Sequence, residues 1–174
     1  MRSVTTLPSP VGRLTLASDG ESLIGLWLEG QKYFGAGLSG TEAEADLPVF
    51  RAAEVWLRAY FARAPLPPLP PLAPQGSFFR QAVWQLLLEI PYGTVTTYGA
   101  LAQKLRDRGI SAAAQAVGGA VGHNPISILI PCHRVVGSDG SLTGYAGGVA
   151  KKQLLLELEG VGMAGLYVPT RGTA

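Results

Sequence analysis

The chain is poor in the side chains that form disulfides and bind metals. Its 174 residues include one cysteine and two histidines. A single cysteine excludes an intrachain disulfide framework and a cysteine-rich zinc site. Charged residues make up only 15% of the chain, and no uncharged apolar run reaches the roughly 18 residues that span a bilayer. We therefore expect a cytoplasmic protein without a membrane segment, a bound metal or a cofactor.

Prolines gather between positions 65 and 74, where they disfavour helix and central strand and favour an extended path. The segment is typical of a stiff linker, and a ligand for a signalling domain is the alternative. It divides the chain into domains 1–74 and 75–174. Up to Pro74 there are six basic and seven acidic residues, against eight and five after it. This asymmetry indicates either a polyanion partner for the second domain or a solvated face.

The first domain has three short apolar or alternating segments, at 4–7, 13–17 and 22–28, separated by prolines and glycines. They predict hairpin strands. A helical stripe follows over 47–63, and we expect it to cover the sheet. The stripe consists of Val49, Ala52, Ala53, Trp56, Leu57 and Tyr60. The glycine-rich stretch 30–40 is either a flexible connection or a ligand loop.

The second domain begins with a helix that Ser77 can cap and Pro91 ends. Its predicted apolar face consists of Phe79, Val83, Leu86, Leu87 and Ile90. Thr97 can cap a helix over 98–105, and Ser111 a second one through Val121, which together suggest a helix-turn-helix. The second helix consists mostly of alanine and glycine. These small residues allow either close approach to another surface or tight packing inside the protein. The predicted fold class is α/β (α+β), with a small sheet-plus-helix domain and a mostly helical second domain.

The cysteine lies in the most informative stretch of the sequence. The apolar run 128–130 predicts a buried strand that Pro131 ends, which would present Cys132 at its rim beside His133 and Arg134. An imidazole, a guanidinium and free N–H groups are surroundings that lower the pKa of a thiol. Cys132 is therefore either a nucleophile or, since free cysteine is often buried, a small core residue.

The residues after Cys132 predict a turn at 138–140, a flexible loop over 143–148 and a helix over 149–159 that Gly160 ends. Lys151 and Lys152 fall in the first turn of this helix, where cations oppose the helix dipole. They are either ordinary surface lysines or contacts to a phosphate group.

Three motifs in order resemble one family. They are Asn124-Pro125, Pro131-Cys132-His133-Arg134-Val135 and Gly144-Tyr145-Ala146-Gly147-Gly148. The combination resembles the O6-alkylguanine-DNA alkyltransferases, also called methylated-DNA–protein-cysteine methyltransferases. The resemblance covers 77–160 well, whereas 1–74 match only in layout. It implies a monomeric suicide repair protein that flips O6-alkylguanine from double-stranded DNA and transfers the alkyl group to a cysteine.

The resemblance also assigns roles to individual residues. Cys132 is the acceptor, His133 the base acting through water, Glu159 the carboxylate that orients His133, and Asn124 a brace for this network. Tyr98 donates toward N3 of the base and crowds the phosphate that rotates during flipping.

Two further groups of residues follow from the resemblance. The pocket for the flipped base is assigned to Tyr98, Val135, Tyr145, Ala146 and Gly147, with the carbonyls of Cys132 and Val135 accepting from the guanine amine and the N–H of Ala146 donating to O6. The DNA-binding face is assigned to Thr97, Tyr98, Ala112, Gln115, Ala116, Gly119 and Lys152.

One position departs from the family. Gln115 stands where relatives usually carry an arginine that fills the gap left by the flipped base. Glutamine lacks the charge and the stacking of a guanidinium, so we expect weaker support for flipping. Arg106 or Arg108, in the adjoining turn, are possible substitutes.

Two other functions stay open at this point. A non-catalytic sensor of alkylation damage resembles the alkyltransferase-like proteins, although these typically carry tryptophan at the cysteine position. A cysteine hydrolase using Cys132, a histidine and Asn124 is also compatible with the residue inventory.

Overall fold

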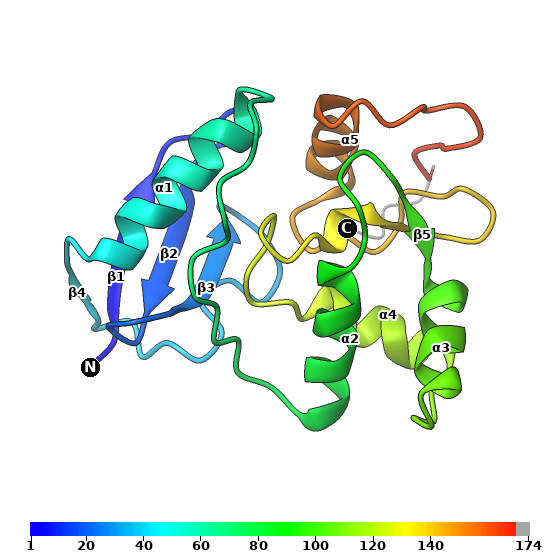
Figure 1. Cartoon of the computed structure of the whole chain (residues 1–174), viewed down its shortest axis with the longest axis horizontal. Helices are drawn as coiled ribbons and strands as arrows, with labels where there is room; N and C mark the ends of the chain where they lie inside the picture. The colour runs from blue at the N-terminus through cyan, green and yellow to red at the C-terminus, as the bar shows by residue number, and fades with distance from the viewer. Residues whose placement is uncertain (170–174) are drawn as a thin grey trace. The chain divides into compact units, whose positions relative to one another are not determined.

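The computed structural model describes residues 1–169. The chain forms two compact units, and each is described separately. The first comprises Met1–Gln75 together with Pro125–Leu129, and the second comprises Gly76–Asn124 and the chain from Ile130 onward. The first holds a sheet and one long helix, and the second is mostly helical (Figure 1). The predicted mixed α and β fold class is confirmed.

The sheet of the first unit has four strands in the order β3-β2-β1-β4. They are β1 (Ser3–Leu7), β2 (Leu14–Ser18), β3 (Leu23–Leu28) and β4 (Ala43–Glu44). The first three pair antiparallel, as the predicted hairpins require, and the Asp19 side chain closes one turn by accepting from the N–H groups of Glu21 and Ser22. β4 pairs parallel to β1 and was not predicted, since two residues give no periodicity.

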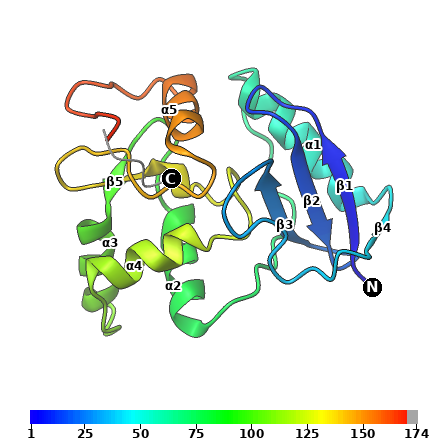
Figure 2. The same cartoon turned by 180° about the vertical axis from the view of Figure 1, so that it is seen from behind.

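Helix α1 (Pro48–Phe61) lies across one face of this sheet in both views (Figures 1 and 2). Its buried face is made of Val49, Phe50, Ala53, Trp56, Leu57 and Tyr60. The predicted stripe is thus correct except that Ala52 is exposed and Phe50 is buried in its place.

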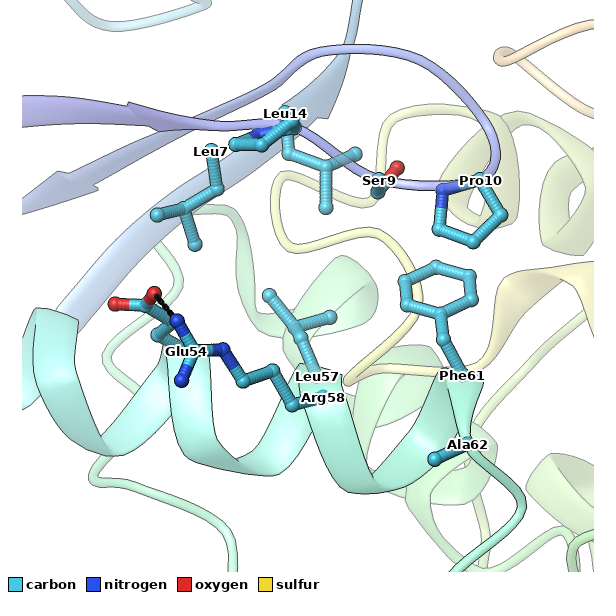
Figure 3. A pocket seen from close by; sticks show the side chains of 10 residues that line it. Leu7, Ser9, Pro10, Leu14, Glu54, Leu57, Arg58, Phe61 and Ala62 are labelled. Atoms are coloured by element: carbon cyan, nitrogen blue, oxygen red, sulfur yellow. Dashed lines mark hydrogen bonds and ion pairs between the residues drawn. The ribbon is translucent and has the colours of Figure 1, made fainter.

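An apolar pocket of about 410 Å³ lies between the first hairpin and α1 (Figure 3). Leu7 and Leu14 line one side, and Leu57 and Phe61 the other. The Glu54–Arg58 ion pair of 2.7 Å lies at its edge. The lining contains none of the predicted site residues.

Two chain segments pair with β3. The end of the proline-rich segment does so through Leu23 N–H to the Pro71 carbonyl, 2.8 Å. The residues before Cys132 do so through Leu26 N–H to the Pro125 carbonyl, also 2.8 Å. The predicted strand over 128–130 is wrong. The residues just before it make one isolated bridge to β3 at Ile126, and 128–130 then follow in a buried turn with Ile128 at φ +70°. The backbone bonds of this turn are local, as in Leu129 N–H to the Ser127 carbonyl.

The second unit has four α-helices and a short parallel strand pair within the described residues. The elements are α2 (Phe78–Leu88), β5 (Thr96–Thr97), α3 (Tyr98–Asp107), α4 (Ala114–Gly122), the 3₁₀ turn η1 (Cys132–Arg134), β6 (Val135–Val136) and α5 (Val149–Leu158). The predicted caps of α2 and α3 are confirmed, because Ser77 accepts from Arg80 N–H and Thr97 from Ala100 N–H. No helix in residues 1–169 is long and apolar enough to cross a membrane.

The predicted cap of α4 is wrong. The helix begins at Ala114, its N-cap Ala113 makes no side-chain hydrogen bond, and Ser111 lies outside it. The Arg106 guanidinium binds the Ala112 carbonyl at 2.7 Å, which holds the connection in an extended path. α4 then packs on α2, where Trp84 Nε1 donates to the Ala120 carbonyl at 2.9 Å. α3 and α4 lie side by side as the predicted helix-turn-helix (Figures 1 and 2).

Candidate active site

Cys132 begins the η1 turn and is buried, with 5% of its surface exposed. Its N–H donates to the Ile130 carbonyl at 2.8 Å, and its own carbonyl accepts from Val135 N–H. The predicted position at the rim of an extended strand is therefore wrong. The sulfur instead lies inside a tight turn, and Cys132 and His133 are neighbours on a 3₁₀ turn.

Burial raises the pKa of the Cys132 thiol, opposite to the lowering that the sequence suggested. Desolvation of the thiolate is the largest cause. A hydrogen bond from the Asn124 side chain, the charge of Lys152 and the backbone N–H groups of Cys132 and His133 act in the other direction. The site thus holds a protonated thiol that these groups help to ionise.

His133 is completely buried and its Nε2 lies 2.6 Å from Glu159 Oε2. The Arg134 guanidinium binds the same carboxylate through both oxygens, at 2.8 Å and 3.1 Å, and Gly93 N–H donates to Oε1 at 3.0 Å. Arg134 also donates to the Ile90 carbonyl at 2.8 Å. Glu159 therefore joins the turn after α2, the Cys132 turn and the end of α5.

The balance of charges favours a neutral imidazole at His133. Desolvation is the main cause that lowers the pKa of His133, while the Glu159 hydrogen bond and charge oppose it and the charges of Arg134 and Lys152 reinforce it. Because the Arg134 guanidinium already balances the negative charge of the Glu159 carboxylate, His133 does not have to be protonated to pair with it. A neutral imidazole can accept a proton.

Asn124 connects α4 to the Cys132 turn. It follows the C-cap His123, is 4% exposed, and its side-chain amide donates to the Ile130 carbonyl at 2.8 Å. It also hydrogen-bonds the Cys132 thiol. The geometry agrees with the brace implied by the resemblance.

Tyr98 begins α3, and its hydroxyl donates to the Thr143 carbonyl at 3.0 Å. The phenol lies directly under Gly144, where an added Cβ would come within 2.5 Å of the hydroxyl oxygen. Burial is the main cause that raises the pKa of Tyr98, so the phenol stays a neutral donor. Tyr98 thus supports the loop that the sequence predicts over 143–148.

Lys152 is completely buried, and its Nζ donates to the same Thr143 carbonyl at 2.9 Å. The prediction that Lys152 is a surface lysine is therefore wrong. Its place in the predicted DNA-binding face is also wrong, because a buried ammonium cannot contact a phosphate directly. The α5 helix turns this side chain inward, which its place in the first helical turn does not reveal.

A groove of about 640 Å³ lies between α3, α4 and the loop before α5. Tyr98, Gln115, Thr143 and Gly144 are in its lining, and Cys132 is not. Of the other residues predicted to bind DNA, Ala116 and Gly119 are exposed on α4, and Thr97 and Ala112 are half-buried. Of the predicted pocket residues, Val135 and Tyr145 are buried, and Ala146 and Gly147 are half-buried.

Two potential substitutes for the missing arginine have other partners. Arg106 binds Gln103 and the Ala112 carbonyl, and Arg108 pairs with Glu89 at 3.2 Å. Gln115 is exposed in the groove.

The sequence did not predict that Arg134 binds Glu159 or that Lys152 is buried in this site. Arg134 was visible in the motif beside His133, but nothing in the spacing indicates that it shares Glu159. No group of three or more histidine, cysteine, aspartate or glutamate side chains in residues 1–169 is arranged to hold a metal ion.

Two protein-family models match the chain. The DNA-binding domain of 6-O-methylguanine DNA methyltransferase matches residues 78–161, and the ribonuclease-like domain of the same family matches residues 3–71. The chain belongs to the 6-O-methylguanine DNA methyltransferase family. The resemblance read from the three motifs is confirmed, and it extends to residues 3–71, where the sequence had shown only a similar layout.

Curated relatives match over most of their length. The methylated-DNA–protein-cysteine methyltransferase of Haemophilus influenzae is 45% identical over 156 residues, which are 89% of this chain and 84% of that protein. The Mycobacterium tuberculosis protein of the same name is 46% identical over 154 residues, 88% of this chain and 90% of that protein.

Solved structures agree. The M. tuberculosis OGT in complex with DNA has a TM-score of 0.79 at 42% identity and covers 94% of both chains. The M. tuberculosis O6-methylguanine methyltransferase has the same TM-score at 45% identity, covering 91% of this chain and 93% of that one.

Proposed function

We propose that this protein repairs DNA by transferring the alkyl group of O6-alkylguanine irreversibly to Cys132. The observation that carries the proposal is the buried Cys132 thiol beside the hydrogen-bonded His133–Glu159 pair, in a chain that belongs to a methyltransferase family. A single thiol that becomes alkylated fits one transfer per molecule. No second cysteine exists to regenerate it.

Transfer requires a thiolate, a leaving group and a balanced proton count. His133 uses Nε2 for Glu159, so Nδ1 is the nitrogen that would take the thiol proton through water. The sulfur then attacks the alkyl carbon, the bond from that carbon to O6 breaks, and its electron pair passes to the guanine. Tyr98 supplies a proton toward N3, and the proton held by His133 restores the phenol. The products are S-alkyl cysteine and guanine.

The base has to leave the helix to react. O6 lies within a stacked base pair, whereas the Cys132 sulfur lies below the protein surface, so an extruded base is required. The small side chains of α4 allow close approach to the duplex, with contacts mainly to the backbone and the minor groove. The proposed DNA face consists of Thr97, Tyr98, Ala112, Gln115, Ala116 and Gly119, which all lie in residues 75–174.

The proposed base pocket uses Tyr98, Val135, Tyr145, Ala146 and Gly147. The Ala146 donor to O6 is the backbone N–H, so alanine serves as well as a hydroxyl residue there. We further propose that the protein acts as a monomer in the cytoplasm, without a metal or a cofactor.

The direct test follows guanine in the DNA. A duplex with one O6-methylguanine is incubated in excess over the protein, and the restored guanine is counted after digestion to nucleosides. We expect one guanine restored per chain and none with Cys132→Ser. Continued turnover would contradict the proposal, and binding without restoration would favour the non-catalytic sensor.

A further inference from the structure

Lys152 is a charged residue in the protein interior, where burying an ammonium is energetically unfavourable. Its side chain is completely buried, and within residues 1–169 the ammonium has one hydrogen-bond acceptor, the Thr143 carbonyl. It lies in the first turn of α5, where a positive charge opposes the helix dipole. Burial of an ammonium with one neutral acceptor is unfavourable, so packing alone does not account for this residue.

The position of the ammonium is fixed from two sides. The Thr143 carbonyl, which also accepts from the Tyr98 hydroxyl, holds it at 2.9 Å. The Tyr98 ring lies beneath it, with Nζ 6.0 Å from the ring centroid, a cation–π distance. The charge is therefore held in place.

The charge acts on the acceptor cysteine. α5, which carries Lys152, packs against η1, which carries Cys132. The two groups interact electrostatically: the Lys152 charge lowers the pKa of the Cys132 thiol, and the thiolate raises the pKa of Lys152. Burial outweighs the second effect and lowers the pKa of Lys152 to about 8, so the ammonium is mostly protonated at neutral pH.

The other ionisable groups around the thiol supply no comparable charge. Arg134 is engaged by Glu159 through two hydrogen bonds, and His133 is neutral. Tyr98 is a neutral phenol. Among the described residues, Lys152 is thus the cation whose charge lowers the pKa of the Cys132 thiol.

We propose that Lys152 is a positioning residue of the transfer reaction, whose buried ammonium favours the charged thiolate form of Cys132. This inference rests on the proposed function and deepens it by naming the charge that offsets desolvation of the sulfur. His133 removes the thiol proton, and Lys152 stabilises the anion that remains. No bond to Lys152 forms or breaks.

The test measures the reaction of Cys132, the single thiol of the chain, with iodoacetamide across a range of pH in the full protein without DNA. Lys152→Met removes the charge and keeps the length of the side chain. Lys151→Met removes the same charge from the neighbouring, half-buried position and is the matched control. We expect the pH midpoint of the reaction to rise by about one unit in Lys152→Met and to stay at the wild-type value in Lys151→Met. Coinciding profiles for all three proteins, or equal shifts in both variants, would overturn the inference.

A second measurement covers the case in which Lys152→Met does not fold. The pKa of Lys152 is followed by NMR of its ε-carbon in the wild type and in Cys132→Ser. Because electrostatic coupling is reciprocal, removing the fraction of Cys132 that is ionised while Lys152 titrates should lower the pKa of Lys152 further. An unchanged pKa would overturn the inference.

Methyl transfer separates this inference from the proposed function. At neutral pH we expect transfer from an O6-methylguanine duplex to be about tenfold slower in Lys152→Met than in wild type, matching one unit of thiol pKa. A shifted iodoacetamide profile in Lys152→Met, together with no methyl transfer by the wild-type protein, would contradict the proposed function while leaving the effect of Lys152 on the thiol intact.

Discussion

Glu159 is the single residue that connects most of the site. Its buried carboxylate accepts hydrogen bonds from His133, Arg134 and the N–H of Gly93. Arg134 is itself buried, with 6% of its surface exposed, so its charge depends on this carboxylate. Loss of the Glu159 charge would leave an arginine in the interior without compensation.

We therefore expect Glu159→Gln to lower the free energy of unfolding by about 3 kcal/mol, the cost of breaking a buried ion pair on one side. Urea denaturation measures it. Glu157→Gln, at an exposed position on the same helix, is the control and should change little. Equal losses in the two variants would contradict the buried ion pair.

His133 predicts a pH dependence of stability. Burial holds its folded-state pKa below the ordinary 6.5, so below pH 6.5 the unfolded chain binds more protons than the folded one. Stability contributed by neutral His133 is present above pH 6.5 and falls as the pH drops below it, by at most about 1.4 kcal/mol per pH unit. Denaturation of the wild type between pH 7.5 and 5.5 should show this slope, and His133→Asn should reduce it. His123→Asn should keep it, and the same slope in all three would show that another group is responsible.

Gln115 predicts a gain of function. It is exposed in the groove, and Arg106 and Arg108 are held by other partners. Gln115→Arg should strengthen binding to duplex DNA and speed transfer, because a guanidinium adds phosphate attraction and stacking. The control Gln85→Arg adds the same charge at an exposed position of α2. Unchanged affinity and rate in Gln115→Arg, or an equal gain in both variants, would refute it.

Single residues differ in how far the sequence reveals them. The structure brings His133 and Glu159 into hydrogen-bond contact as the resemblance implied, although their roles stay predictions. The predicted lowering of the Cys132 pKa was wrong, because neighbours along the chain indicate which charges are present but not how far the thiol is removed from water. Burial of Lys152 depends on segments distant in sequence and had no local signal.

At the scale of elements, the segment after α5 braces one wall of the groove. Leu142 N–H donates to the Tyr167 carbonyl at 2.9 Å, Tyr167 N–H to the Gly140 carbonyl at 3.0 Å, and the Tyr167 hydroxyl to Asp139 at 2.6 Å. Asp139 and Thr143 line the groove. Nothing in the sequence predicted a role for residues 161–169, which form a strap on the loop before α5 through the contacts of Tyr167.

The tightest point of this strap is Gly140, where an added Cβ would lie 1.8 Å from the Gly165 carbonyl oxygen at φ +90°. Gly140→Ala should break the pairing, lower stability by about 1–3 kcal/mol and slow methyl transfer. Gly109→Ala, at φ +81° with open space around it, carries the backbone strain without the clash. Thermal unfolding and single-turnover transfer would compare them, and equal effects would rule out the strap.

Elements with local signals were predicted well, and elements held by remote partners were not. Ser77 and Thr97 cap helices as expected, because a cap and an apolar stripe are both local. The run 128–130 looked like a strand but is a turn, since only the residues before it bond to β3 and its own backbone bonds go to neighbouring turn residues. The start of α4 was misplaced at Ser111 because the Arg106 contact to the Ala112 carbonyl lies outside any capping pattern.

At the scale of the whole molecule, a segment from after the proline-rich stretch pairs with a strand from before it, through Leu26 N–H and the Pro125 carbonyl. Pro125–Leu129 belong to the first compact unit although they directly precede the Cys132 turn in sequence. The division of roles between 1–74 and 75–174, with DNA binding and alkyl acceptance in the second, stays a prediction. The family models match both parts, at residues 3–71 and 78–161.

The most direct test of the central claim is the intact mass of the protein after reaction with a duplex that contains one O6-methylguanine. The account predicts a gain of one methyl group that stops at one, maps to the peptide with Cys132 and is absent in Cys132→Ser. An unchanged mass of the wild-type protein, or a methyl group on another residue, would contradict it.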